Sequence, residues 1–561
     1  MVIRSLSIRR FRGLEDLRWQ PRAGINCLVG PGDAGKTTIL EAIALLLYPR
    51  RPPLISEYHY FRRRLHEGFE IEAVLGGLTD AVTGSMRVAP LRGWLKGELQ
   101  PLPDEAGAEP VLVTRLTGSA DLELTYELIP PSGDPLPFTT AMRQQLILAE
   151  LGADDRGSRE LRLAQGSLLE RHLSGIDFRR PLTSAIANAS TRLELPEEAQ
   201  EAIARISERF RTEGLPSALR LGLLAPQGFP LVGLLSLFSG ADPAEAVPLA
   251  ASGSGTRQLA LFRLALSLVE GAPVLVFDEP ESGLEPYRQR AVIAELRRVI
   301  TPGGQAFLTT HSPAILDSLD PGELWLLRSG ESPASLGTGP IGDVVRRAPD
   351  ALLSLLPVLC EGHTEAGFLR PLLDRLASAD QLGSLDLLGV RLIPGTGQPK
   401  ILDEADALLA AGIGCGLFAD AEDKHSGRRQ RLASQNRCAY GSWDGVRNVE
   451  EAVATWVPFE HLSEVVAVAA AQLNRSTESL HQQIAERCNQ PSIRDLVRLR
   501  EVCGEPGVRA ALARAMNEGN WFKDAERGAA LATRLAELGL PAEIGSTVQR
   551  FWNNIRGALQ Q

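Results

Sequence analysis

The chain has 561 residues, 44% of them hydrophobic and 23% charged, and this length exceeds what one hydrophobic core supports, so we expect two to four domains. The net charge of −10 excludes a uniformly basic nucleic-acid binder, and any such contact must come from local basic patches. No apolar run reaches the roughly 18 residues of a membrane helix, and no signal peptide is recognisable at the start. Six cysteines without a CxxC pair argue against a zinc site and a disulfide framework, and favour the cytoplasm.

In chain order, the N-terminal half predicts strands at 1–11 and 24–30, a helix over 36–47 and an antiparallel pair within 110–129 that turns near Gly118 and Ser119. A helical, charged stretch occupies 139–225. "APVLVFDEP" is apolar without alternation, which is typical of a buried strand in a parallel sheet.

The segment "GPGDAGKTT" fits G-x-x-x-x-G-K-[ST] between a predicted strand and a predicted helix, which is the context of a phosphate-binding P-loop. Backbone N–H groups cradle the phosphates, Lys36 reaches the β and γ oxygens, and Thr37 can hold Mg²⁺. The expected nucleotide-binding residues of this loop are Gly30, Gly32, Asp33, Ala34, Gly35, Lys36, Thr37 and Thr38.

Further motifs follow in a fixed order. "VLVFDEP" ends in Asp278, suited to Mg²⁺, and Glu279, suited to polarising the attacking water. "SGSGTRQ" (252–258) precedes this strand, "ESGLEP" (281–286) follows it, and "LTTHSP" places His311 at a strand end.

Together these motifs resemble the SMC-like branch of the ABC-type ATPases. The resemblance implies a signature at Ser254 and Gly255 that completes the nucleotide site of a second subunit, a switch histidine at His311 and a D-loop at 282–286. It therefore implies a dimer. Gly32 stands where the family has Asn, Asp33 follows it, and the Q-loop glutamine has no evident counterpart, so slow or regulatory hydrolysis is expected.

We expect an ATPase domain over 1–330, a Gly-, Ser- and Pro-rich linker over 331–356 and a second α/β domain with added helices over 357–561. In the second domain "VLCEGHTEAGF" offers Glu361 at a strand end and Glu365 in the next helix. "GLFADAEDK" offers Asp420 and Glu422, and "RNVEEAVATW" offers Glu450 or Glu451. Carboxylates gathered at strand ends repel one another unless a divalent cation neutralises them, and Mg²⁺ or Mn²⁺ prefers such ligands.

The layout of strand-Glu-Gly, helix, then strand-Asp-x-acid resembles the Toprim fold. An ABC ATPase joined to Toprim resembles the OLD (overcoming lysogenisation defect) nucleases, which include the nuclease subunit of the Gabija phage-defence system. This resemblance implies metal binding by Glu361, Glu365, Asp420, Glu422 and Glu450, a transition-state role for Lys523, and dimerisation through the insert at 139–225. It also implies ATP, Mg²⁺ or Mn²⁺ (with Ca²⁺ as a non-catalytic substitute), DNA as the substrate and a possible helicase or effector partner.

One departure affects the metal ligands. The family's D-x-D is here Asp420-Ala421-Glu422-Asp423, so either Glu422 supplies the second carboxylate with a longer arm or Asp423 does so after a one-residue shift. The alternative function is accordingly an ATP-binding sensor or scaffold with a degenerate Toprim site that acts through a partner.

Two basic runs, 61–68 and 424–431, could contact DNA phosphates, and in the second the candidates are Lys424, Arg428, Arg429 and Arg431. A topoisomerase would need a nucleophilic tyrosine, and Tyr440 has no matching context. A primase would need a zinc-binding cluster, which the cysteine spacing does not provide.

Overall fold

The computed structural model describes residues 1–49, 54–78, 91–103, 106–144, 148–151, 247–267, 273–300, 303–421, 423–443 and 445–560, with isolated positions between 146 and 239. The chain divides into two compact units: Met1–Cys27 with Gly35–Thr310, and Leu28–Ala34 with His311–Gln561. Most of the predicted helical insert at 139–225 lies outside the described residues, which include α3 (Thr140–Gln144) and β10 (Leu148–Leu151) of it.

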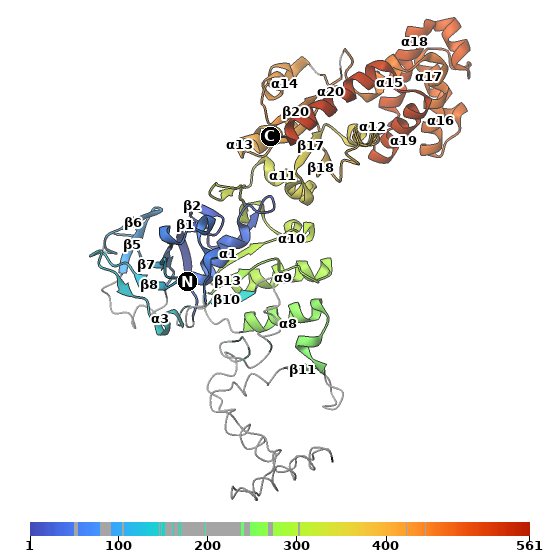
Figure 1. The fold of residues 1–561 in the computed structure, drawn as a ribbon. Helices are drawn as coiled ribbons and strands as arrows, with labels where there is room; N and C mark the ends of the chain where they lie inside the picture. Colours follow the sequence, from blue (N-terminus) through green and yellow to red (C-terminus); the bar gives the residue numbers. More distant parts are fainter. Residues whose placement is uncertain are drawn as a thin grey trace, which may run out of the picture. The chain divides into compact units, whose positions relative to one another are not determined.

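The first unit contains an antiparallel sheet with the order β2-β1-β4-β7-β5-β6, in which β8 also pairs with β7 and β9 pairs with β8 (Figure 1). The predicted antiparallel pair is confirmed, because β7 and β8 pair from Thr114 with Leu128 to Gly118 with Leu124. The strands of this sheet are β1 (Val2–Phe11), β2 (Leu14–Trp19), β4 (Phe69–Gly76), β5 (Leu91–Leu95), β6 (Glu98–Gln100), β7 (Glu109–Gly118), β8 (Leu124–Leu128) and β9 (Leu136–Pro137).

A second sheet of this unit runs in the order β10-β13-β14-β3. Strands β13 (Val274–Phe277) and β14 (Gln305–Thr309) are parallel and fully buried, as the unbroken apolar pattern predicted. After β3 (Gly24–Val29) the chain enters α1 (Lys36–Leu46), which contacts β1, β4, β7, β13 and β14. Helices α8 (Ser254–Ser267) and α9 (Pro286–Ile300) flank β13 in sequence.

In the second unit, the segment that follows His311 is structured. It contains α10 (Pro313–Ser318), β15 (Leu324–Leu326), β16 (Ala334–Ser335), α11 (Pro340–Arg347) and the 3-10 helix η7 (Pro349–Leu353). The stretch 331–356, expected to be a linker, therefore carries two helices. A buried ion pair at 2.6 Å joins Arg347 of α11 to the fully buried Glu404 of α13 (Gln398–Ala410).

The core of the second unit is a four-stranded sheet with the order β18-β17-β19-β20, and each neighbouring pair is parallel. The strands are β17 (Leu356–Cys360), β18 (Val390–Pro394), β19 (Cys415–Phe418) and β20 (Cys438–Gly441). After β17 the chain adds β18 on one side of it and then β19 and β20 on the other side. The strand order therefore reverses between β17 and β19. In open parallel sheets, sites form at the carboxyl ends of the strands at such a switch point.

The remaining helices of this unit account for the expected helical C-terminal part. One large apolar core joins alternate residues of β17 (Leu356, Val358 and Cys360) to α12 (His363–Ala379) and to the helices after β20. These helices are α15 (Val449–Trp456), α16 (Leu462–Leu473), α17 (Thr477–Arg487), α18 (Leu496–Glu518), α19 (Ala525–Leu538) and α20 (Ala542–Leu559). Helix α13 contacts β17, β19 and α14 (Ser426–Ala433).

Candidate nucleotide site and candidate metal centre

The predicted P-loop has the backbone of a phosphate-binding turn. It joins β3 to α1, and φ is positive at Gly30, Asp33 and Gly35. A side chain at Gly30 would place Cβ 2.1 Å from the carbonyl oxygen of Leu327, and one at Gly35 would place it 2.8 Å from Leu14 Cδ2. Glycine is therefore required at both positions, and the turn leads directly into the N-terminus of α1.

The residues expected to hold Mg²⁺ and water gather in the first unit. Lys36 is buried, and Thr37 Oγ1 donates to Asp278 Oδ1 at 3.2 Å. Thr309, at the end of β14, donates to the same Asp278 oxygen at 2.5 Å and accepts from the Glu279 backbone N–H at 3.2 Å. Asp278 and Glu279 both follow β13, and they are held there by Thr309 at the end of the adjacent parallel strand β14 and by Thr37 at the start of α1. This arrangement suits a magnesium-bound phosphate and a water next to it.

The predicted signature begins a helix. Ser254 and Gly255 are the first residues of α8, and Cβ at Gly255 would lie 2.3 Å from the carbonyl oxygen of Gly283 in the predicted D-loop. Gly283 has φ +74°, and its own Cβ would lie 2.6 Å from Ser254 Oγ. The two motifs are therefore in close backbone contact at the N-terminus of α8. His311 follows Thr310 immediately and belongs to the second unit.

At the carboxyl edge of the second unit's sheet, three strand ends are joined by hydrogen bonds. Glu361 directly follows β17, and its Oε2 accepts from the backbone N–H of Asp420, after β19, at 3.0 Å. The same oxygen accepts from Nε2 of Gln398, the first residue of α13, at 3.2 Å. Gln398 Nε2 also donates to the Asp420 carbonyl at 2.7 Å. Glu361 and Asp420 are therefore neighbours at the switch point.

Glu365 lies one turn into α12, where its carboxylate bends back over the helix start: Cβ at Gly362 would be 2.9 Å from its Oε2. Only 6% of Glu365 is exposed. Burial, together with the nearby carboxylates of Glu450 and Glu361, raises the pKa of Glu365 to about 7, against the opposing charge of Lys523. The four side chains therefore share one electrostatic environment although they come from three separate segments of the chain.

The two adjacent glutamates of α15 have different surroundings. Asn448 caps the helix by accepting from the Glu451 backbone N–H at 3.0 Å, and the Glu451 carboxylate accepts from the Arg447 backbone N–H at 2.9 Å. Glu450 is only 3% exposed, and its buried Oε1 has no hydrogen-bond partner among the described residues. Burial raises the pKa of Glu450, and Lys523 opposes this shift.

Lys523 is positioned by its neighbours in the sequence. Trp521 and Phe522 are fully buried, and the Phe522 carbonyl accepts a 2.8 Å hydrogen bond from Thr364 Oγ1 on α12. Asp524 then caps α19 by accepting from the Arg527 backbone N–H at 2.8 Å. Helices α12 and α19 approach closely at Gly367 and Gly528, where any Cβ would meet the other helix's backbone at 2.1 and 2.7 Å.

These residues fit a divalent cation by their chemistry. An orphaned buried oxygen on Glu450 and mutually repelling carboxylates are what a hard cation relieves. Within the described ranges, no three Asp, Glu, His or Cys side chains are already grouped closely enough to enclose a metal. Glu422, predicted as a ligand, lies outside the described residues, whereas Asp423 begins the short helix η8 (Asp423–His425).

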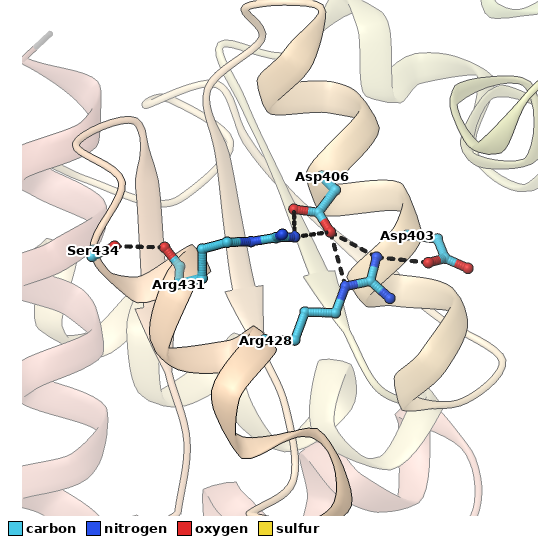
Figure 2. A network of polar contacts seen from close by, with 5 residues as sticks. All are labelled: Asp403, Asp406, Arg428, Arg431 and Ser434. Atoms are coloured by element: carbon cyan, nitrogen blue, oxygen red, sulfur yellow. Dashed lines mark hydrogen bonds and ion pairs between the residues drawn. The ribbon is translucent and has the colours of Figure 1, made fainter.

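The second basic run is engaged within the protein, which argues against three of its four predicted phosphate contacts. Arg428 bonds to Asp403 and Asp406 of α13 at 2.6 and 2.7 Å, and Arg431 bonds to Asp406 at 2.7 Å (Figure 2). Arg429 is buried, and its Nη1 donates to the Asp420 carbonyl at 2.7 Å. Lys424 is exposed. The runs of like charge in the sequence could not reveal these acidic partners, because the partners lie 22 to 25 residues earlier, on another helix.

Gln398 and Thr364 are site residues that the sequence did not single out, and Arg429 was singled out only as a contact to DNA phosphates. Gln398 belongs to the glycine-rich "IPGTGQPK", where its place at the first position of a helix was the available signal. Thr364 carried no such signal, because its partner Phe522 lies 158 residues later, and the role of Arg429 depends on Gln398, 31 residues earlier.

The P-loop and the Asp278-Glu279 pair at the end of β13 are the parts of a P-loop ATPase domain. Family models agree on the ATPase part: residues 5–85 match an "AAA domain", and residues 122–317 match "AAA domain, putative AbiEii toxin, Type IV TA system". Among the described residues, no helix combines the length and apolar character that crossing a bilayer requires.

Among known proteins, the chain is similar to the OLD nuclease of Thermus scotoductus, with 25% identity over 346 residues, which covers 56% of this chain and 60% of that protein. A shorter stretch of 76 residues is 49% identical to the DNA double-strand break repair Rad50 ATPase of Methanopyrus kandleri, covering 14% of this chain and 8% of the relative. The chain thus spans less than two thirds of either relative's length. An SMC head bound to the C-terminal winged-helix domain of ScpA aligns with 60% of this chain and 98% of its own, at 17% identity and a TM-score of 0.36.

Proposed function

We propose that the protein is an ATP-regulated, divalent-metal-dependent DNA endonuclease with a Toprim-type site, acting in antiphage defence or DNA repair. The observation that carries the proposal is the buried Glu450 oxygen without a partner, which shares its surroundings with Glu365 and Lys523 at the sheet's switch-point edge. The similarity to the OLD nuclease supports the same conclusion.

The metal ligands in this proposal are Glu361, Glu365, Asp420, Glu450 and Glu422 (or Asp423 in its place). Bound divalent cations supply a clamp on the attacking and leaving oxygens of phosphodiester cleavage. The protein's own part is to hold the carboxylates in place and to keep Glu450 and Glu365 out of water. Lys523 adds a positive charge beside the same carboxylates, where it can neutralise a phosphate oxygen as negative charge develops. The Glu451 carboxylate is already bonded to the Arg447 backbone N–H, which favours Glu450 as the ligand.

The ATPase head would regulate this chemistry. Lys36 and the P-loop amides bind the phosphates, Thr37 and Asp278 hold Mg²⁺, and Glu279 orients the water. We propose that Ser254 and Gly255 complete the site of a second copy, that His311 senses the γ-phosphate and that the protein is therefore at least a homodimer. The sensor or scaffold alternative rests on the Asp-Ala-Glu-Asp departure and on the absence of a closed three-carboxylate group among the described residues.

The test is cleavage of supercoiled plasmid with Mg²⁺ or Mn²⁺, with and without ATP. We expect the wild type to nick or linearise the plasmid and the Glu450→Gln variant to leave it intact. The matched Glu451→Gln variant should still cleave. Lys36→Ala shows in which direction ATP regulates cleavage. Intact plasmid in every lane, from protein that still hydrolyses ATP, would favour the sensor and its partner.

A further inference from the structure

Arg429 is a buried arginine among exposed ones. It lies on α14 and is 8% exposed, whereas the side chain of Arg431 on the same helix is 61% exposed. A buried guanidinium is costly unless its N–H groups find acceptors. Arg429 has two such acceptors, the Asp420 carbonyl at 2.7 Å and Gln398 Oε1 at 3.3 Å. Arg429 therefore faces the carboxylate edge of the sheet, and it is not available to DNA.

These contacts decide how the Gln398 amide is oriented. Arginine has donors only, so the oxygen of the amide must face Arg429. The amide nitrogen then points to Glu361 Oε2, at 3.2 Å, and to the Asp420 carbonyl, at 2.7 Å. Gln398 is 1% exposed, so no water competes for these bonds.

The result is a closed set of bonds around Asp420. Its N–H donates to Glu361 Oε2, and its carbonyl accepts from both Gln398 and Arg429. Both bonds to the Glu361 carboxylate use Oε2, so Oε1 keeps no hydrogen bond among the described residues. The turn before Gln398 is anchored as well, because the Gly395 N–H donates to the Cys360 carbonyl at 2.7 Å.

We propose that Arg429 and Gln398 are positioning residues that lock the Asp420 backbone and aim one oxygen of Glu361 outward to bind a divalent cation. This inference rests on the proposed nuclease function. Arg429 touches neither metal nor DNA: it orients Gln398, and Gln398 orients Glu361. Partners of this kind that orient metal ligands typically contribute roughly 10- to 100-fold to metal affinity or activity.

The experiment measures Mn²⁺ binding to the full chain by calorimetry, and plasmid cleavage as a function of Mn²⁺ and of DNA, for wild type, Arg429→Lys and Gln398→Met. Arg431→Lys, on the same helix, is the matched control. We expect Mn²⁺ affinity to fall roughly 10- to 100-fold in the first two variants, with KM for plasmid unchanged, and no change in Arg431→Lys. Melting in EDTA checks folding, and Gln398→Met, which keeps length and burial, carries the test if Arg429→Lys does not fold.

Unchanged Mn²⁺ affinity in both variants would overturn the inference, and a raised KM for plasmid in Arg429→Lys alone would return Arg429 to DNA binding. If the wild type binds Mn²⁺ and cleaves plasmid, and both variants do so equally well, the positioning role is refuted and the nuclease proposal stands. A wild type that binds no Mn²⁺ refutes both.

Discussion

Thr364 Oγ1 on α12 donates a 2.8 Å hydrogen bond to the carbonyl of Phe522, 158 residues later in the chain. The bond connects the helix that carries Glu365 to the residue before Lys523. The helix that carries Glu365 and the segment that carries Lys523 are thus joined by a buried hydroxyl.

Thr364→Val should separate Lys523 from its carboxylate neighbours. Leaving the buried Phe522 carbonyl without its donor costs about 1–3 kcal/mol. If Lys523 shifts so that the activation free energy of cleavage rises by about 1.4 kcal/mol, the rate falls about tenfold, and we expect a loss of at least this size. ATP hydrolysis should not change. Thr364→Ser, which keeps the hydroxyl, should restore cleavage. Wild-type cleavage by Thr364→Val would mean that the bond does not position Lys523.

Gly367→Ala should destabilise the second unit, because its Cβ would lie 2.1 Å from the Ala525 carbonyl oxygen. Overpacking of this kind costs about 1–3 kcal/mol or more, measurable as a lower midpoint in urea. Gly557→Ala is the matched control: it also replaces a helical glycine, in α20, but nothing lies within 4 Å of its Cβ. We expect it to be neutral or stabilising. Equal loss in both variants would contradict a close helix contact at Gly367.

The raised pKa of Glu365 predicts a pH-dependent stability. The pKa of Glu365 is about 7 in the folded protein, against an ordinary value of 4.5. Between pH 4.5 and pH 7 the folded protein therefore keeps a proton on Glu365 that the unfolded chain has lost. The stabilisation is complete below pH 4.5 and is lost as the pH rises through 7, so the metal-free protein should melt at a lower temperature at pH 8 than at pH 5.5.

Divalent cation should reverse this loss, because metal displaces the proton, so the rise in Tm on adding Mn²⁺ should be larger at pH 8 than at pH 5.5. Glu365→Gln has no proton to lose and should flatten the pH dependence of the metal-free protein. A metal-induced shift that is independent of pH in the wild type would argue that Glu365 is not close to the cation.

The dimer proposal predicts complementation between two inactive variants. Lys36→Ala removes a subunit's own phosphate contact, and Ser254→Arg blocks the α8 start that would serve the partner's site. In a mixed dimer, the P-loop of the Lys36→Ala subunit faces the altered α8 of the Ser254→Arg subunit, so this site has both defects. The other site combines an intact P-loop with an intact α8 start and has neither defect. Random mixing makes half the dimers mixed, so ATP hydrolysis should recover to about a quarter of wild type. Each variant alone should stay inactive, and no recovery on mixing would contradict a shared site.

Some of this architecture is local in origin, and the sequence determined it. The P-loop binds phosphates with consecutive backbone groups of one turn, so a nine-residue pattern with its flanking strand and helix was sufficient to predict it. The buried parallel strands β13 and β17 were recognisable from unbroken apolar runs, because both faces of such a sheet are covered. Glu361 and Glu365 were predicted as a pair because one strand end and one helical turn join them. The domain limits, the role of 139–225 and Glu422 as a ligand stay predictions.

Tertiary structure alone decided which charged side chains turn inward. Arg428, Arg429 and Arg431 form one basic run, yet the first and last bond to acidic residues of α13 while the middle one is buried beside Asp420. Glu450 and Glu451 are adjacent and chemically identical, and only the packing of α15 buries the first and leaves the second to accept from the Arg447 backbone N–H. The physical reason is the same in both cases: the side of a helix that faces the interior is set by what packs against it, and those neighbours come from distant parts of the chain.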